Sequence, residues 1–135
     1  MISEVEFAPK KMGYLARASE SGQSPAVIQL HERYGIVKHT TDIAERLSKN
    51  GYVTLAPDLF SRFTGDRQGL AAGDIGVGIR DEEALRDLDE CVSYLRSLDY
   101  VDGDRIAVMG VCQTGRQPLL AAAEEPLPLP LPSER

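Results

Sequence analysis

Tryptophan is absent from this 135-residue chain, and it contains only two cysteines and two histidines. It also lacks a long hydrophobic run, whereas a membrane-spanning helix needs about 18 or more consecutive apolar residues. The first residues, Met1-Ile2-Ser3-Glu4, lack the basic flank and apolar core of a signal peptide, so we expect a cytoplasmic location without membrane contact. Basic residues are outnumbered by acidic ones, 15 to 21, which argues against a nucleic-acid partner.

The few cysteines and histidines are also poorly placed for a metal site. Cys91, Cys112, His31 and His39 do not occur at the spacings of zinc ligands, and two cysteines make no disulfide framework. A dinucleotide-binding fingerprint is excluded at residues 76–78, because Asp81 stands where its third glycine belongs. We therefore expect no metal site.

What is present suffices for one domain with a hydrophobic core. The chain is 42% hydrophobic and 27% charged, with a net charge of −6, and its length fits one domain but not two. Three short apolar runs predict buried strands, and an alternating segment before them predicts a pair of half-buried strands split at Pro9. The buried runs are Pro25–Leu30, Tyr52–Ala56 and Arg105–Met109.

Helical patterns lie between these strands. We expect a helix from Thr41 to Asn50, with Asp42 and Glu45 as a capping box and Asn50-Gly51 at its end. A longer helix is expected from Asp81 to Leu98, with Cys91 on its apolar stripe and hence in the core. Residues 61–80 contain five glycines and predict a loop, either an ordinary long one or a mobile lid. Asp102-Gly103 predicts a turn.

Strands alternating with helices predict an α/β fold, with a mostly parallel sheet flanked by helices. We assign residues 1–123 to this domain and residues 124–135 to a proline-rich tail. Prolines at every second position from Pro126 to Pro132 exclude helix and central strand there. A ligand for a proline-binding domain is one interpretation, but no Pro-x-x-Pro motif occurs, so we favour an unstructured end.

The most informative local motif follows the third buried strand. Gly110 to Gly115 has the form of a nucleophile elbow, in which a tight turn between strand and helix presents Cys112. The dipole of the following helix favours the reactive thiolate. Two alternatives remain: a merely buried cysteine, or a nucleotide-binding P-loop in which Arg116 and Gln117 replace the required Lys and hydroxyl residue.

Three ordered segments together resemble the dienelactone hydrolase family, whose members are carboxymethylenebutenolidase-like enzymes of the α/β-hydrolase superfamily. These segments are Leu30–Gly35, Gly51–Phe60 and Arg105–Cys112. The resemblance covers roughly residues 3–123. It implies an α/β-hydrolase fold and hydrolysis of a small-molecule lactone or ester, without metal or organic cofactor.

The resemblance also implies roles for individual residues. Cys112 is expected to be the nucleophile, and Glu32 the carboxylate that interacts with its thiol. The backbone N–H groups of Arg33 and Gln113 are expected to form the oxyanion hole. His31 is expected to be structural rather than the catalytic base.

Several features depart from the family pattern. The family triad also needs an Asp and a His, yet neither residue type follows Cys112, and the C-terminal strands are missing. Thr114 stands where the family has glycine and is expected to crowd the turn. Pro118 is expected beyond the first turn of its helix, where it would kink it. We interpret the chain as a truncated or frame-shifted family member.

Two consequences are expected. Without the triad His, an acylated cysteine lacks its base, so we expect at most a stoichiometric burst. The alternative to a working hydrolase is therefore a catalytically incomplete remnant or pseudoenzyme. The strand at Arg105–Met109 would have an exposed edge, so we expect self-association. Arg62, Arg67 and Arg80 are candidates for holding a substrate carboxylate, but solvated loop charges are the favoured interpretation.

Overall fold

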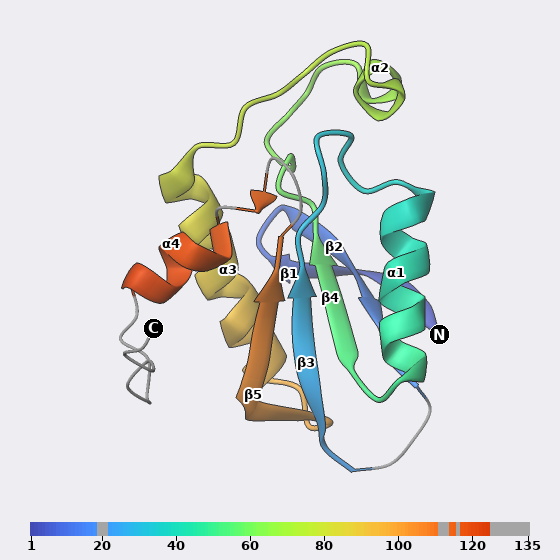
Figure 1. Cartoon of the computed structure of the whole chain (residues 1–135), viewed down its shortest axis with the longest axis vertical. Coiled ribbons are helices and arrows are strands. Elements are labelled where there is room, and N and C mark those ends of the chain that lie inside the picture. Colours follow the sequence, from blue (N-terminus) through green and yellow to red (C-terminus); the bar gives the residue numbers. More distant parts are fainter. Residues whose placement is uncertain (19–21, 111–113, 116, 125–135) are drawn as a thin grey trace, which may run out of the picture.

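The computed structural model describes residues 1–18, 22–110, 114–115 and 117–124. They form one sheet with helices on both faces (Figure 1). The strands are β1 (Ile2–Ala8), β2 (Lys11–Ala16), β3 (Ser24–Gln29), β4 (Val53–Pro57) and β5 (Val101–Met109). The helices are α1 (Lys38–Lys49), α2 (Arg67–Ala72), α3 (Asp81–Arg96) and α4 (Gln117–Glu124).

The strand order within the described residues is β1-β2-β4-β3-β5. β3 pairs in parallel with β4 and β5, whereas β2 pairs antiparallel with β1 and β4. The predicted α/β fold with flanking helices is confirmed, and the sheet is mixed because the N-terminal hairpin adds antiparallel strands. Since β3, β4 and β5 run in one direction, their carboxyl ends meet at one edge.

The hydrophobic core lies between the sheet and α3. Ile28, Leu55, Cys91 and Leu95 are fully buried there. In Figure 1, α1 covers one face of the sheet, and α3 with α4 lies on the other. The apolar stripe predicted for 81–98 is thus confirmed, and so is the core position of Cys91. Burial raises the pKa of the Cys91 thiol well above its ordinary value.

The start of α1 differs from the expectation. The helix begins at Lys38, where the Thr40 hydroxyl accepts a hydrogen bond from the Val37 N–H at 3.3 Å. The predicted capping box at Asp42 is therefore wrong, because Asp42 lies inside the helix and pairs with Lys38 at 2.7 Å. The predicted end is confirmed, with Gly51 in the left-handed region at φ 97°.

The region 61–80 is not entirely loop, because it contains the short helix α2. The Asp66 carboxylate accepts a hydrogen bond from the Gly69 N–H at 3.0 Å and caps the first turn. Gly73 ends the helix with φ 83°. Local capping, rather than apolar periodicity, therefore defines this helix.

Two other local expectations are revised. The turn predicted at Asp102-Gly103 does not separate two elements, because both residues lie within β5. The pairing of β5 with β3 is irregular there: Ser24 pairs with Val101, and Ala26 pairs with Ile106. Pro118 is the second residue of α4, so it lies in the first turn. A missing N–H costs nothing there, and the expected kink is wrong.

β5 lies at one edge of this sheet. Among the described residues, β3 is the partner of β5 and no strand pairs with its other side. The proline-rich tail lies outside the described residues. None of the helices in the described part of the chain is long and apolar enough to span a membrane.

Candidate active site

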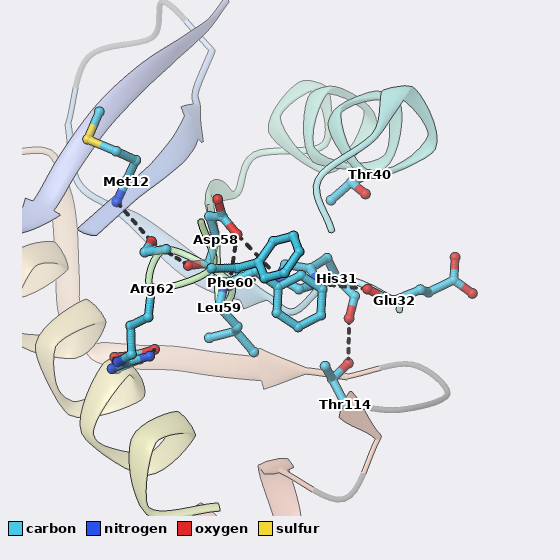
Figure 2. Close-up of polar contacts among 12 residues, drawn as sticks. Met12, His31, Glu32, Thr40, Asp58, Leu59, Phe60, Arg62 and Thr114 are labelled. Atoms are coloured by element: carbon cyan, nitrogen blue, oxygen red, sulfur yellow. Dashed lines mark hydrogen bonds and ion pairs between the residues drawn. The ribbon is translucent and has the colours of Figure 1, made fainter. Parts of the chain in front are cut away.

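The carboxyl ends of β3 and β5 meet at the segments that the sequence singled out. The Leu30 N–H donates to the Met109 carbonyl at 2.8 Å, which continues the pairing to the end of β5. The Thr114 hydroxyl then donates to the His31 carbonyl at 3.0 Å, and both side chains are buried (Figure 2). The loop after β3 and the turn after β5 are thus tied together.

The turn after β5 requires its first glycine. A Cβ atom on Gly110 would lie 2.2 Å from the Thr114 carbonyl oxygen and 2.8 Å from its carbon. Such an approach between backbone atoms leaves no space for a side chain. Thr114 fits as well, because its hydroxyl is hydrogen-bonded rather than crowded. Gly110 and Thr114 therefore have the close approach that a tight strand-to-helix turn needs.

His31 connects the ends of β3 and β4. Its Nε2 accepts a hydrogen bond from the Leu59 N–H at 2.9 Å, so the proton of the neutral ring is assigned to Nδ1. That Nδ1 lies 2.7 Å from the Glu32 carbonyl and donates to it. The ring is 4.7 Å from that of Phe60, with an interplanar angle of 56°. With both nitrogens engaged, His31 is structural in this arrangement and is not placed as a base.

Burial lowers the pKa of His31. The Glu32 carbonyl and the nearby Asp58 carboxylate, 3.9 Å from Nε2, act in the opposite direction. The cation of Arg67 lowers the pKa further. The neutral ring is therefore the form that this site favours.

Glu32 and Arg33 follow His31 in the loop after β3, and both are half-buried. The Glu32 side chain is half-buried, and in Figure 2 its carboxylate extends away from the His31 ring and from Thr114. The Arg33 guanidinium donates to the Gly73 carbonyl at 3.1 Å. Arg33 thereby connects the loop after β3 with the end of α2, a contact that the sequence did not indicate.

Two arginines hold the loop after β4, although the sequence favours solvated loop charges at both positions. Arg67 binds the Asp58 carboxylate at 3.1 Å and also donates to the Phe60 carbonyl. Arg62 binds the buried carboxylate of Asp87 on α3. The solvated-charge interpretation is therefore wrong for both. It is confirmed for Arg80, whose side chain is mostly exposed.

Two of the predicted site residues, Cys112 and Gln113, lie outside the described residues, so their roles stay predictions. A small cavity of about 30 Å³ lies beside the strand ends, lined in part by His31, Glu32 and Met109. Its volume has room for about one water molecule and is too small for a lactone. Among the described residues, no group of three or more His, Cys, Asp and Glu is arranged to bind a metal ion.

Asp87 is the main residue that the sequence reasoning missed. It lies on the buried stripe of α3, three residues after Ala84 and four before Cys91. A carboxylate on an apolar stripe indicates a buried ion pair, because an unpaired buried charge is costly. That signal was present in the sequence, although its partners Arg62 and Lys11 were not identifiable from it.

The chain is similar to known proteins over most of its length. Residues 12–128 match the profile of the Dienelactone hydrolase family. The "Putative carboxymethylenebutenolidase" of Methylorubrum extorquens is 31% identical over 118 residues, which cover 84% of this chain and 40% of that protein. The "Probable 2-oxo-3-(5-oxofuran-2-ylidene)propanoate lactonase" of Bradyrhizobium is 35% identical over 114 residues, covering 83% and 46%.

A solved structure shows the same architecture. The "Putative Dienelactone Hydrolase" of Klebsiella pneumoniae superposes with a TM-score of 0.78 at 28% identity. The match covers 93% of this chain and 55% of that one. The chain thus spans less than half the length of the two relatives named above.

Proposed function

Because the chain belongs to the dienelactone hydrolase family, we propose that it reacts with a lactone or carboxylic ester through Cys112 as nucleophile. The observation that carries the proposal is the hydrogen bond between the Thr114 hydroxyl and the His31 carbonyl. It holds the turn of the nucleophile against the loop that contains Glu32 and Arg33. The close approach of Thr114 to Gly110 supports a tight turn at Cys112.

The proposed step is acyl transfer to sulfur. Glu32 takes the proton of the Cys112 thiol, and the thiolate attacks the carbonyl carbon of the substrate. The carbonyl oxygen becomes an oxyanion that accepts hydrogen bonds from the N–H groups of Arg33 and Gln113, each worth about 3 kcal/mol. As the oxyanion collapses, the C–O bond to the leaving group breaks. The protonated Glu32 returns its proton to the alkoxide, and a thioester to Cys112 remains.

The names of the relatives favour lactones over open esters as substrates. One relative is named for a butenolide and another for an oxofuran lactone. In a lactone the leaving alkoxide stays attached to the acyl group, so a single covalent adduct contains both parts. We propose an unsaturated lactone as the substrate class.

Turnover is a separate matter from acylation. No Asp or His follows Cys112 in the 135 residues, and His31 is engaged at both nitrogens. Within these 135 residues the thioester therefore has no His or Asp of this kind to assist its hydrolysis. For these residues by themselves we propose acylation of Cys112 with little turnover.

The test uses an activated ester, p-nitrophenyl acetate, and a butenolide as probes. We expect a burst of about one nitrophenolate per chain and an acetyl adduct that peptide mapping locates at Cys112. The Cys112→Ser variant should show no thioester adduct, whereas the matched Cys91→Ser variant should keep it. Absence of an adduct in the unaltered protein, or an adduct that survives in Cys112→Ser, would contradict the proposal. Continued turnover would contradict the proposal of little turnover but not the proposal that Cys112 is acylated.

We also propose that the protein self-associates through β5, with a second copy as the partner. β5 is an edge strand within the described residues, and its second half is the apolar run Ile106–Met109. Unpaired N–H and C=O groups along such an edge are a template for another strand. Pairing of β5 with its own copy would join two sheets into one.

A further inference from the structure

The peptide unit between Glu32 and Arg33 is held at its carbonyl oxygen by two donors. His31 Nδ1 donates to the Glu32 oxygen at 2.7 Å, and the Gly35 N–H donates to it at 3.1 Å. No described residue accepts a hydrogen bond from the Arg33 N–H, which belongs to the same peptide unit. In a trans peptide the C=O and the N–H point in opposite directions. Fixing the Glu32 oxygen therefore fixes the direction of the Arg33 N–H.

His31 can hold this oxygen because its ring and its main chain are themselves held by neighbouring residues. The Leu59 N–H on the β4 side donates to Nε2 at 2.9 Å. The ring of Phe60 packs against the imidazole, and the Thr114 hydroxyl from the β5 side binds the His31 carbonyl. Figure 2 shows these contacts converging on His31. The side chain is fully buried, so water does not compete for either nitrogen.

We infer that His31 is a positioning residue that orients the Arg33 N–H as an oxyanion donor. The inference rests on the proposed function, in which that N–H stabilises the oxyanion. His31 itself touches neither substrate nor sulfur. It acts in the neutral form with the proton on Nδ1, because only this tautomer accepts from Leu59 and donates to Glu32. The charged groups that face it are Asp58 and Arg67.

This role separates two reactions of the same thiol. Acylation of Cys112 by an ester passes through an oxyanion and therefore depends on the direction of the Arg33 N–H. Alkylation by iodoacetamide displaces iodide from a saturated carbon, so no oxyanion forms. A residue that merely stabilised the fold or the thiolate would change both rates together. A positioning residue changes the acylation rate alone.

The experiment measures both rates at Cys112 in the unaltered chain and in His31→Phe, which keeps a ring against Phe60 but removes both nitrogens. We expect acylation by p-nitrophenyl acetate to fall at least tenfold and at most about 1000-fold, the upper value being that for a lost oxyanion donor. Alkylation should change by less than about twofold. The matched control His39→Phe, at an exposed position on α1, should leave both rates unchanged.

Each outcome has a separate meaning. Equal acylation in His31→Phe and the unaltered chain overturns the inference, and so does an equal loss of acylation and alkylation. No acylation of the unaltered chain refutes the proposed function instead. If His31→Phe does not fold, nitrogen-15 NMR of the unaltered chain decides. A protonated Nδ1 with an unprotonated Nε2 supports the inference, and the opposite tautomer overturns it.

Discussion

The Arg62 guanidinium donates to both carboxylate oxygens of the buried Asp87, at 2.8 Å from Nη2 and 3.3 Å from Nη1. Lys11 on β2 donates to the same carboxylate at 2.8 Å. Asp87 therefore joins the loop after β4, the strand β2 and the helix α3 at one point. Its side chain is 2% exposed, so its charge depends on these two partners.

The first prediction concerns this carboxylate. Asp87→Asn keeps the shape of the side chain but removes its charge, which leaves Lys11 and Arg62 without their shared anion. We expect the free energy of unfolding to fall by about 3 kcal/mol, the lower end of the range for a broken buried pair. Urea denaturation measures the change. Asp89→Asn, on the exposed side of the same helix, should have an effect below about 0.5 kcal/mol. Equal losses in the two variants would contradict the prediction.

The second prediction is a pH dependence of stability. Burial lowers the pKa of His31 below 6.5 in the folded state, so the unfolded chain binds more protons in this range. The stability contributed by the neutral ring is complete above pH 6.5 and is lost as the pH falls toward the folded-state pKa. The free energy of unfolding should fall by up to about 1.4 kcal/mol per pH unit below 6.5.

Urea denaturation at about pH 7.5 and about pH 5.5 measures this loss. The exposed His39 provides the control, and His39→Gln should keep the full pH dependence. His31→Phe should lose it. A midpoint that is the same at both pH values in the unaltered chain would show that His31 does not cause the effect.

The third prediction concerns Cys91. The side chain is fully buried. Burial is the main cause that raises the pKa of its thiol, and the negative charges of Asp87 and Glu90 raise it further. The thiolate is the reactive form, so iodoacetamide should leave Cys91 unmodified in the native protein. Peptide mapping by mass spectrometry, with and without urea, measures the protection. Similar labelling of Cys91 under both conditions would be inconsistent with its core position.

The fourth prediction tests the turn after β5. In Gly110→Ala the added Cβ would meet the Thr114 carbonyl oxygen at 2.2 Å, and backbone atoms there must shift. We expect a loss of about 2 kcal/mol in stability and loss of the ester adduct at Cys112. Gly78→Ala is the matched control, because nothing lies within 4 Å of its added Cβ. A Gly110→Ala variant that folds and reacts normally would rule out a tight turn.

The fifth prediction concerns the β5 edge. Ala107 is exposed on this strand, and charged residues on edge strands oppose pairing with another chain. We expect the unaltered protein to associate with increasing concentration and Ala107→Lys to shift toward the monomer. Sedimentation velocity over a range of concentrations measures this. Leu119 on α4 is also exposed, so Leu119→Lys tests whether any added charge has the same effect. A monodisperse, unaltered monomer with a sharp thermal transition would refute the self-association.

The strands and α3 could be predicted because their signals are local. Apolar runs such as Ala26–Ile28 and the stripe through Leu88, Cys91 and Leu95 depend only on neighbours within a turn or a strand. The elements that were missed depend on single contacts. α1 begins three residues before the predicted start, because the Thr40 hydroxyl accepts a hydrogen bond from the Val37 N–H in its first turn. α2 forms among glycines because the Asp66 carboxylate accepts a hydrogen bond from the Gly69 N–H.

The order and periodicity of the residues were sufficient to predict the α/β class and the family. They could not assign the hydrogen bonds that build the site, because the partners are far apart in the chain. Thr114 and His31 are separated by 83 residues, Leu59 and His31 by 28, and Arg62 and Asp87 by 25. Periodicity predicts which face of a helix or strand a residue occupies, but it does not predict which distant residue packs against that face. The sheet order places β3 between β4 and β5, and that arrangement gives His31 its partners on both sides.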